Sequence, residues 1–462
     1  MSDNFKTNTL DSLCELIVDC PHSTPTWTTF GYVVIRNQNI TDGVLDLSSP
    51  SYTDYSGYRD RTKRASPQEN DIVITREAPM GRVCLIPKEP ICCLGQRQVL
   101  LRADRNKISA EYLYWSLRSP FVQRQILINE GTGATVSNMR IPVLKALEIP
   151  RLASIEIENK KARDLSNIQN KIQLNTQINQ TLEQIAQALF KSWFVDFDPV
   201  RAKVQALSDG LGLEQAELAA MQAISGKTPE ELTALSQAQP DRYAELAETA
   251  KAFPCEMEEI DGVELPKGWK FSTIGEEVET VGGATPSTKE ESFWNNGKIA
   301  WTTPKDLSSA TSPVLINTER KITELGLKKI SSGLLPIGTV LLSSRAPVGY
   351  LALTKIPVAI NQGYIAIKCN KTLSNFYMLQ WCKENLEEIK SRASGTTFLE
   401  ISKTTFRGIS VIVPENNILI MFNKQCESIY EMITTHTKEN QDLEKARDLL
   451  LPRLLKGEIL NG

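Results

Sequence analysis

The chain repeats itself once, and this repeat limits its possible folds more than any other feature of the sequence. Ala78–Gly81 returns as Ala346–Gly349 after 268 residues, Gln96 returns as Gln362 after 266 residues, and Asn179–Glu183 matches Asn440–Glu444 after 261 residues. The matches keep their order while their separation shrinks, as differences in loop length would produce. The sequence therefore predicts a tandem duplication of a unit of about 200 residues, rather than an array of short repeats.

The first part of each copy, residues 1–152 and 263–414, contains short β-prone runs separated by Gly, Pro, Asn and Asp. One helical stretch lies in each part, at Ala110–Arg118 and at Asn375–Ser391. This pattern predicts two similar mixed α/β domains of the α+β class. The clearest β-prone runs are Tyr32–Ile35, Asp71–Thr75, Gln98–Leu101, Thr339–Leu342 and Ile409–Val413.

The second part of each copy, residues 153–198 and 415–462, has the pattern of a long polar helix. Residues 168–190 and 429–451 are identical at eight of 23 positions, and their periodic residues alternate between spacings of three and four. Such a spacing over three heptads is typical of a coiled-coil seam, and polar residues within it fix the register. We therefore expect the two helices to pair with each other; the alternative is an amphipathic helix that packs on its own domain. The predicted seam residues are Ile168, Ile172, Asn179, Leu182, Leu189, Ile429, Ile433, Asn440, Leu443 and Leu450.

Between the copies lies an acidic connector, residues 199–262. The formal net charge of the whole chain is −3, but residues 199–268 hold thirteen acidic and six basic side chains, or −7, which leaves +4 for the rest. A mildly basic body of this kind can present a surface to phosphate groups. The connector contains helical runs rich in Ala, Glu and Leu, and we expect it either to dock a protein partner or simply to link the halves.

The sequence offers little catalytic chemistry. The chain has only two histidines, His22 and His436, which argues against a zinc site and against histidine acid–base catalysis. Gly226–Thr228 resembles the end of a phosphate-binding loop, but Met221 stands where that motif needs glycine. Neither a glycine-rich cofactor turn nor an Asn/Asp-Pro-Pro-aromatic loop for a flipped adenine occurs. We expect no catalytic residues and no metal ligands.

Features that would direct the chain out of the cytoplasm are also missing from the sequence. Its longest apolar run, Ile418–Phe422, is far shorter than the roughly 20 residues of a membrane span. Its start lacks the pattern of a secretory signal, and its nine cysteines are an odd number without a C-x-x-C motif. We predict a cytoplasmic protein with reduced thiols and no membrane contact.

A pattern suited to binding nucleic acid remains. Tyr58–Arg64 is predicted to be a basic loop that can neutralise phosphates or reach base edges, although a solvated surface loop would look the same. Gly131–Thr135 and Ser394–Thr397 are Gly/Thr turns suited to a phosphate oxygen, or ordinary tight turns. Arg76 and Arg345 lie beside the repeated Ala-Pro-x-Gly turns, where each either presents a cation or forms a structural ion pair. The candidate DNA-binding residues are Arg59, Arg61, Lys63, Arg64, Arg76, Arg97, Thr132, Thr135, Lys305, Arg345, Gln362, Thr396 and Thr397.

The duplication suggests how to divide these candidates by role. Residues that the two halves share should serve the scaffold or position phosphates, whereas residues that differ should read different bases. The Arg59–Arg64 segment has no basic counterpart around Thr323–Leu334 beyond Lys328 and Lys329. Two similar frames with different faces suit a reader of two unlike half-sites.

Along essentially its whole length, the chain resembles the specificity subunits of Type I restriction–modification systems. The residues that carry the resemblance are Asn179–Glu183 with Ala188–Pro199, the junction Glu264–Trp269, the paired Gly-Thr turns, and the terminal Leu451–Glu458. The resemblance implies two target recognition domains, each reading one half of a bipartite double-stranded DNA sequence. It also implies that the two helical regions pair as an antiparallel coiled coil, which spaces the domains and docks two modification subunits.

According to the same resemblance, the chain is a non-catalytic part of a DNA adenine methyltransferase and site-specific deoxyribonuclease. The modification subunits would carry S-adenosylmethionine, and restriction subunits would add the ATP- and Mg-dependent motor and nuclease. The residues themselves leave two other functions open. One is a coiled-coil scaffold with two interaction domains and no DNA binding, and the other is a self-sufficient enzyme.

Overall fold

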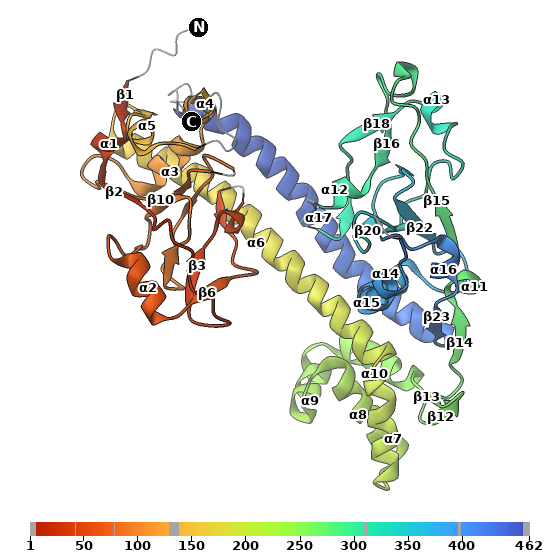
Figure 1. The fold of residues 1–462 in the computed structure, drawn as a ribbon. Helices are drawn as coiled ribbons and strands as arrows, with labels where there is room; N and C mark the ends of the chain where they lie inside the picture. Colours follow the sequence, from red (N-terminus) through yellow and green to blue (C-terminus); the bar gives the residue numbers. More distant parts are fainter. Residues whose placement is uncertain are drawn as a thin grey trace. The chain divides into compact units, whose positions relative to one another are not determined.

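A computed structural model describes residues 6–41, 43–77, 79–128, 138–308, 310, 312–395 and 399–455 (Figure 1). The chain divides into two compact units, one made of residues 1–173 and 441–462, the other of residues 174–440. Two long helices, α6 (Ile155–Phe194) and α17 (Asn416–Leu455), contribute residues to both units. The first domain belongs to the first unit; the second domain and the connector belong to the second.

The first domain is built on an antiparallel sheet in the order β2-β10-β7-β8. A second sheet has the order β6-β3-β9, in which β3 and β9 run parallel. Every residue of β7 is buried, because apolar clusters pack against both of its faces. Pairs β1-β11 and β4-β5 complete the described strands. The bounds are β1 Thr7–Thr9, β2 Cys14–Asp19, β3 Tyr32–Ile35, β4 Ile40–Thr41, β5 Val44–Leu45, β6 Ser51–Thr53, β7 Ile72–Thr75, β8 Val83–Leu85, β9 Cys92–Leu94, β10 Gln98–Ala103 and β11 Glu148–Pro150.

The helices of this domain follow from local capping and apolar spacing. Ser109 accepts a hydrogen bond from the Tyr112 amide at 3.2 Å and so starts α3, which spans the predicted residues Ala110–Arg118. The segment predicted as a basic loop is instead largely helical, because Asp54 accepts from the Gly57 amide at 2.7 Å and caps α2 (Tyr55–Thr62). The other helices are α1 Leu10–Leu13, η1 Asn37–Asn39, α4 Pro120–Ile128 and α5 Ile141–Lys145.

The second domain repeats this topology. Its main sheet has the order β15-β22-β19-β20-β17, and its second sheet the order β18-β16-β21, again with a parallel pair, β16 and β21. Strands β14 and β23 pair as β1 and β11 do in the first domain. The bounds are β14 Lys270–Thr273, β15 Glu279–Gly282, β16 Ile299–Thr302, β17 Val314–Leu315, β18 Arg320–Ile322, β19 Val340–Ser343, β20 Leu351–Thr354, β21 Ala359–Ile360, β22 Tyr364–Lys368 and β23 Ser410–Val413.

The helices of the second domain also follow the repeat. Ser374 caps α14 (Asn375–Glu384) through the Tyr377 amide at 3.2 Å, as Ser109 caps α3. Helix α15 (Leu386–Ser391) follows it, so the single predicted stretch is divided at Asn385. The remaining helices are α11 Ile274–Glu277, η2 Glu291–Phe293, α12 Pro304–Ser308, α13 Glu324–Leu327 and α16 Lys403–Arg407.

The connector folds into helices with a core of its own. Ala220, Met221, Leu232 and Ala250 are buried among one another. Lys203 is 1% exposed, and its ammonium donates to the Phe253 carbonyl at 2.6 Å, beyond the end of α10. The connector is therefore a packed element of the second unit. Its helices are α7 Asp198–Ser208, α8 Leu213–Ser225, α9 Pro229–Ala238 and α10 Pro240–Ala252, and a hairpin of β12 Met257–Ile260 and β13 Val263–Pro266 follows.

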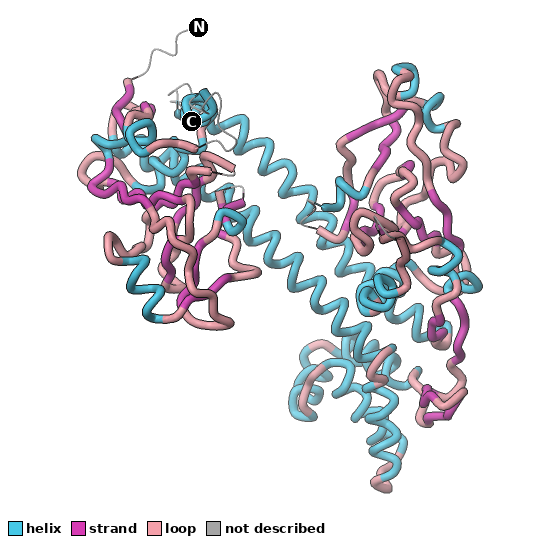
Figure 2. Tube along the Cα trace, in the orientation of Figure 1, coloured by secondary structure: helices cyan, strands magenta, loops and turns pink. Residues whose placement is uncertain are grey.

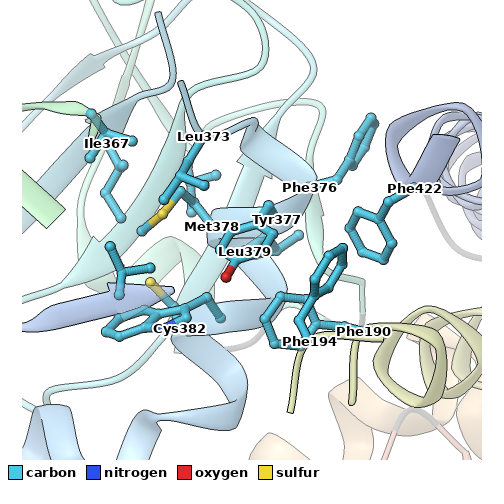
Figure 3. Packing of buried hydrophobic residues seen from close by; sticks show 14 of the residues in the cluster. Phe190, Phe194, Ile367, Leu373, Phe376, Tyr377, Met378, Leu379, Cys382 and Phe422 are labelled. Atoms are coloured by element: carbon cyan, nitrogen blue, oxygen red, sulfur yellow. The ribbon is translucent and has the colours of Figure 1, made fainter. Parts of the chain in front are cut away.

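An aromatic cluster joins the long helices to the second domain (Figure 3). Phe194 of α6 lies 5.0 Å, between ring centroids, from Tyr377 of α14 and 5.0 Å from Phe422 of α17. Phe190 also contacts Tyr377, at 5.1 Å. Edge-to-face aromatic pairs of this kind add about 0.5–1.5 kcal/mol each to the burial of the rings. The end of α6 is therefore part of the core of the second unit.

Figure 2 shows the strands confined to the two domains and the β12-β13 hairpin, while α6, α17 and most of the connector are helical. Among the described residues, no helix is both long enough and apolar enough to cross a membrane. The structure thus has the predicted architecture, with two similar α/β domains and two long helices that pack together.

Candidate nucleic-acid interface

Equivalent backbone hydrogen bonds build the same edge in both domains. The Arg76 amide donates to the Arg97 carbonyl at 2.8 Å in the first domain, and the Ser344 amide donates to the Gly363 carbonyl at 2.8 Å in the second. Arg76 is therefore equivalent to Ser344, and Arg97 to Gly363. The neighbouring residues are then also paired. We call these positions the rim: residues 76, 77, 96 and 97 in the first domain, and residues 344, 345, 362 and 363 in the second.

The two rims share one side-chain contact. Gln96 Nε2 donates to Thr24 Oγ1 at 3.3 Å, and Thr285 Oγ1 donates to Gln362 Oε1 at 2.7 Å. Gln96 and Gln362 are the glutamines of the internal repeat, and they occupy the same position in the two rims. In each domain, a threonine of the loop after the first strand of the main sheet therefore contacts the rim glutamine.

Arg76 is committed to the interior of the first domain. Its guanidinium pairs with Asp19 Oδ2 at 2.5 Å and donates to the Met139 carbonyl at 3.0 Å and to Asn138 Oδ1 at 3.2 Å. The residue is 8% exposed. These contacts match the structural ion pair, which the sequence left open as one alternative for this arginine.

Arg97 is exposed at the same rim. Its backbone has a φ of 66°, in the left-handed region that long L side chains rarely adopt. The side chain is 55% exposed, and its Nε lies 3.3 Å from Glu77 Oε2. Glu77 also accepts from Asn138 Nδ2 at 2.7 Å, which fixes the carboxylate. The rim thus holds a solvent-facing guanidinium beside an anchored carboxylate.

The basic residues of α2 and the turn that follows it divide into two groups. Arg61 is buried and donates to the carbonyls of Leu94 at 3.0 Å and Gly95 at 3.3 Å, so it supports the turn that carries Gln96. Burial lowers the pKa of this guanidinium from its ordinary value. The other three predicted residues, Arg59, Lys63 and Arg64, are exposed.

A pocket of about 470 Å³ opens beside the first rim. Trp27 and Arg36 stand in its wall, with the guanidinium carbon of Arg36 5.3 Å from the centre of the Trp27 ring. An exposed aromatic ring next to arginines suits a nucleic-acid base, which stacks on such surfaces. The remaining lining residues are Thr24, Pro25, Asn37, Gln38, Gly95, Gln96 and Arg97.

The second rim carries a different set of charges. Arg345 occupies the position of Glu77, is 36% exposed, and lies 3.7 Å from Glu400. Lys305, also predicted, is 79% exposed and lies 3.4 Å from Glu319. Gly363 leaves no room for a side chain, because a Cβ there would stand 2.9 Å from Pro304 Cγ. The cation at the second rim therefore comes from Arg345.

Four predicted residues lie outside the described part of the chain: Thr132, Thr135, Thr396 and Thr397. Sequence reasoning had also passed over Trp27, Phe30 and Arg36, of which Phe30 is 80% exposed. The available signal was two aromatic residues, Trp27 and Phe30, among Thr and Pro before a buried strand.

The long helices pair in antiparallel fashion within the second unit. Asn175 Nδ2 donates to Asn440 Oδ1 at 2.9 Å, and Asn179 Oδ1 lies 3.0 Å from His436 Nδ1. These two contacts are equivalent in the internal repeat, because a displacement of 261 residues relates Asn175 to His436 and Asn179 to Asn440. Of the predicted seam residues, Ile172, Asn179 and Ile433 are buried. The half-buried ones are Ile168, Leu182, Leu189, Ile429, Asn440, Leu443 and Leu450.

Glu183 adds a polar joint that sequence reasoning missed. Its carboxylate accepts from Tyr430 of α17 at 2.8 Å and from Gln380 of α14 at 3.2 Å, and it also pairs with Lys383. Burial lowers the pKa of Lys383, although the charge of Glu183 opposes this effect. The available signal was the identity of Glu183 and Glu444 in the repeat.

Two buried cysteines, Cys92 and Cys93, precede the rim residue Gln96 in the chain. Burial raises the pKa of Cys92 to about 12 and of Cys93 to about 11, so both thiols stay protonated and unreactive at neutral pH. Within the described ranges, no three His, Cys, Asp or Glu side chains gather in a way that could hold a metal ion.

Comparison with known proteins agrees with this geometry. The family model described as "Type I restriction modification DNA specificity domain" matches the chain twice, at residues 2–184 and 266–452. The chain is 42% identical, over 370 residues, to the Type I restriction enzyme HindI specificity subunit of Haemophilus influenzae; this covers 78% of the chain and 80% of that protein. It is 35% identical, over 192 residues, to the MjaIX specificity subunit of Methanocaldococcus jannaschii, covering 41% of the chain and 44% of that protein.

A solved structure shares the fold. The crystal structure of a Type I restriction–modification S subunit from M. genitalium aligns with 98% of this chain and 96% of its own, with a TM-score of 0.53 and 17% identity. This match extends over both domains and both long helices.

Proposed function

Because this chain belongs to the Type I restriction–modification DNA specificity family, we propose that its two domains each read one half of a bipartite DNA target. As a specificity subunit it confers DNA target recognition and is itself non-catalytic. The proposal assigns the reading of one half-site to residues 1–152 and of the other to residues 263–414. The single observation that carries it is the repeated rim, which has one frame and two different sets of charges.

The exposed candidates of the two domains are the proposed contacts to DNA. Seven of the predicted residues are at least partly exposed: Arg59, Lys63, Arg64, Arg97, Lys305, Arg345 and Gln362. Lysine and arginine neutralise phosphates, and arginine or glutamine can also pair with base edges. Arg61 and Arg76 act through the backbone that they hold, as positioning residues. The four threonines outside the described residues remain predicted phosphate contacts.

We assign the spacing of the domains to the long helices. Each has 40 residues, about 60 Å at 1.5 Å per residue, which exceeds the 34–36 Å of one DNA turn. The antiparallel contacts of Asn175 and Asn179 support the proposed pairing of the helices, and such a pairing suits half-sites that face opposite ways. Residues 153–198 and 415–462 would also dock two modification subunits.

The chemistry of modification and cleavage falls to partner subunits. The chain would join modification subunits that bind S-adenosylmethionine and methylate adenine, and restriction subunits that use ATP and Mg. The acidic connector, residues 199–262, is a folded part of the second unit, and its surface remains available to a protein partner. We place the assembly in the cytoplasm, where its DNA substrate lies.

Mapping methylated adenines tests this function. Cells that carry the chain with its modification subunit should show one bipartite methylated motif. Replacing residues 1–152 with the corresponding domain of another specificity subunit should change one half of that motif only. A change in both halves, or in neither, would contradict the assignment. A salt-independent gel shift, or none in the presence of the modification subunit, would instead favour a protein scaffold.

A further inference from the structure

The two rims place their exposed arginines at positions that are not equivalent. Backbone hydrogen bonds relate Arg97 to Gly363 and Glu77 to Arg345. A further pair of bonds, in which Met139 donates to Arg76 and Ile401 to Ser344, both at 3.0 Å, relates the preceding residues, Asn138 and Glu400. The first domain therefore has Glu, Asn and Arg where the second has Arg, Glu and Gly.

Arg97 occupies a backbone conformation that works against folding. A non-glycine residue with φ near 66° is destabilised relative to glycine, because its Cβ lies too close to the backbone. Such outliers gather at functional sites, where the side chain has a task that outweighs the strain. The equivalent residue of the second domain, Gly363, has no positive φ, so the left-handed backbone is a feature of the first rim and is not shared by the second.

Steric constraints explain why the second domain uses the other position. A Cβ on Gly363 would stand 2.9 Å and 3.1 Å from two ring carbons of Pro304 and 3.2 Å from Asn361 Oδ1. An arginine at residue 363 would therefore have to displace Pro304. The second domain presents Arg345 instead, from the segment that follows β19.

Each arginine forms an ion pair with a carboxylate, but its guanidinium stays accessible to solvent. Arg97 lies 3.3 Å from Glu77, and Arg345 lies 3.7 Å from Glu400, with both arginines partly exposed. Exposed ion pairs of this kind are weak, so a stronger bidentate partner can replace the carboxylate. Arg61 and Arg76, by contrast, are buried and hold backbone carbonyls.

We propose that Arg97 and Arg345 are the specificity-determining residues of the two half-sites, each donating two hydrogen bonds to a guanine edge. A guanidinium matches the O6 and N7 acceptors of guanine in the major groove, and no other base offers that pair. Because the two arginines occupy rim positions that are not equivalent, Arg97 before β10 and Arg345 after β19, they would meet different base steps in the two half-sites. This inference rests on the proposed function and assigns the base contact within it.

Adenine-methylation mapping of Arg97→Ala and Arg345→Ala tests the inference. We expect Arg97→Ala to relax one guanine of the half-site that residues 1–152 determine, with about ten- to a hundredfold less discrimination, while the other half-site is unchanged. Arg345→Ala should do the same in the other half-site. An unchanged motif would overturn the proposal. So would DNA binding that is weakened equally on all sequences and depends less on salt concentration, because that result indicates a phosphate contact.

A matched control tests whether the loss of any exposed arginine in this domain would have the same effect. Arg105 is exposed and follows β10, whereas Arg97 precedes the same strand. Arg105→Ala should leave the motif unaltered, and relaxation of the same guanine by this variant would overturn the proposal.

Arg97→Gly tests whether a changed motif reflects loss of folding, because glycine adopts this φ without strain. It should melt no lower than the parent chain and show the same relaxed guanine; full discrimination in this variant would overturn the proposal. The two hypotheses fail differently. If exchanging residues 1–152 changes one half-site but Arg97→Ala changes nothing, only the residue assignment fails.

Discussion

The two domains have the same strand order but stabilise their main sheets with different ion pairs. Both support their main sheet with a basic residue at the same place, Arg102 in the first domain and Lys368 in the second. Arg102 makes two hydrogen bonds, of 2.8 Å and 2.7 Å, to Asp71, which is 2% exposed. Lys368 lies 2.8 Å from Glu279 in a half-exposed pair across the strands. The two domains therefore share the order of their strands and differ in the charges that the strands carry.

The comparison also separates charges that hold the frame from charges that, on the proposed function, would meet DNA. Charges that face inward, such as Asp71 and Arg76, hold the frame. Charges that face solvent at the rim, such as Arg97 and Arg345, differ in position between the domains. If these arginines read bases as we propose, specificity changes without rebuilding the fold.

The buried ion pair should give the largest effect. Arg102→Ala leaves Asp71 without its main partner in the interior, and we expect a loss of about 3 kcal/mol in the free energy of unfolding. Lys368→Ala removes the equivalent side chain from an exposed pair and should cost about 0.2–1 kcal/mol. Denaturant titration of the two variants checks this. Equal losses in the free energy of unfolding would contradict the expectation that the more buried ion pair contributes more to stability.

Position 97 and its equivalent 363 should respond to substitution in opposite directions. Gly363→Ala forces a Cβ to within 2.9 Å of Pro304, and we expect it to destabilise the chain by about 1–3 kcal/mol. Arg97→Gly relieves a left-handed backbone and should stabilise it by up to about 1 kcal/mol. Thermal unfolding measures both changes. A destabilised Arg97→Gly would mean that Arg97 contributes to the fold itself.

The repeat, the domains and the paired helices could be predicted because they leave long patterns in the sequence. The displacements of 268 and 266 residues are those at which the structure places equivalent rim residues. The spacing of three and four residues identified helices whose structural bounds are Ile155–Phe194 and Asn416–Leu455. These features depend on many residues, so single exceptions do not obscure them.

The roles of individual cations could not be predicted, because they depend on burial. Arg59 and Arg61 are two residues apart in one helix, yet Arg59 faces solvent while Arg61 holds the carbonyls of Leu94 and Gly95. The segment itself was expected to be a loop, since the cap that Asp54 supplies depends on a geometry that the sequence does not display. Trp27 and Arg36 form their contact only once the sheet brings their segments together.

Acid should produce the smallest difference between the domains. Hydrogen bonds from Lys368 and Asn370 lower the pKa of Glu279. Its folded pKa then lies below the unfolded value of about 4.3, so the stabilisation is present at neutral pH and disappears as the pH falls through the folded pKa. The stability gap between the parent chain and Lys368→Ala should therefore narrow below about pH 4. A gap that widens toward acid would contradict this sign.

The most direct test of the central claim is a chain that carries the first domain twice, with residues 1–152 in place of residues 263–414. Methylated adenines would be mapped in cells that express it with the modification subunit, after copurification of the two proteins has been verified. If each domain reads its own half-site, the motif should become an inverted repeat of the first half-site. An unsymmetrical motif that still contains the original second half-site would contradict the account.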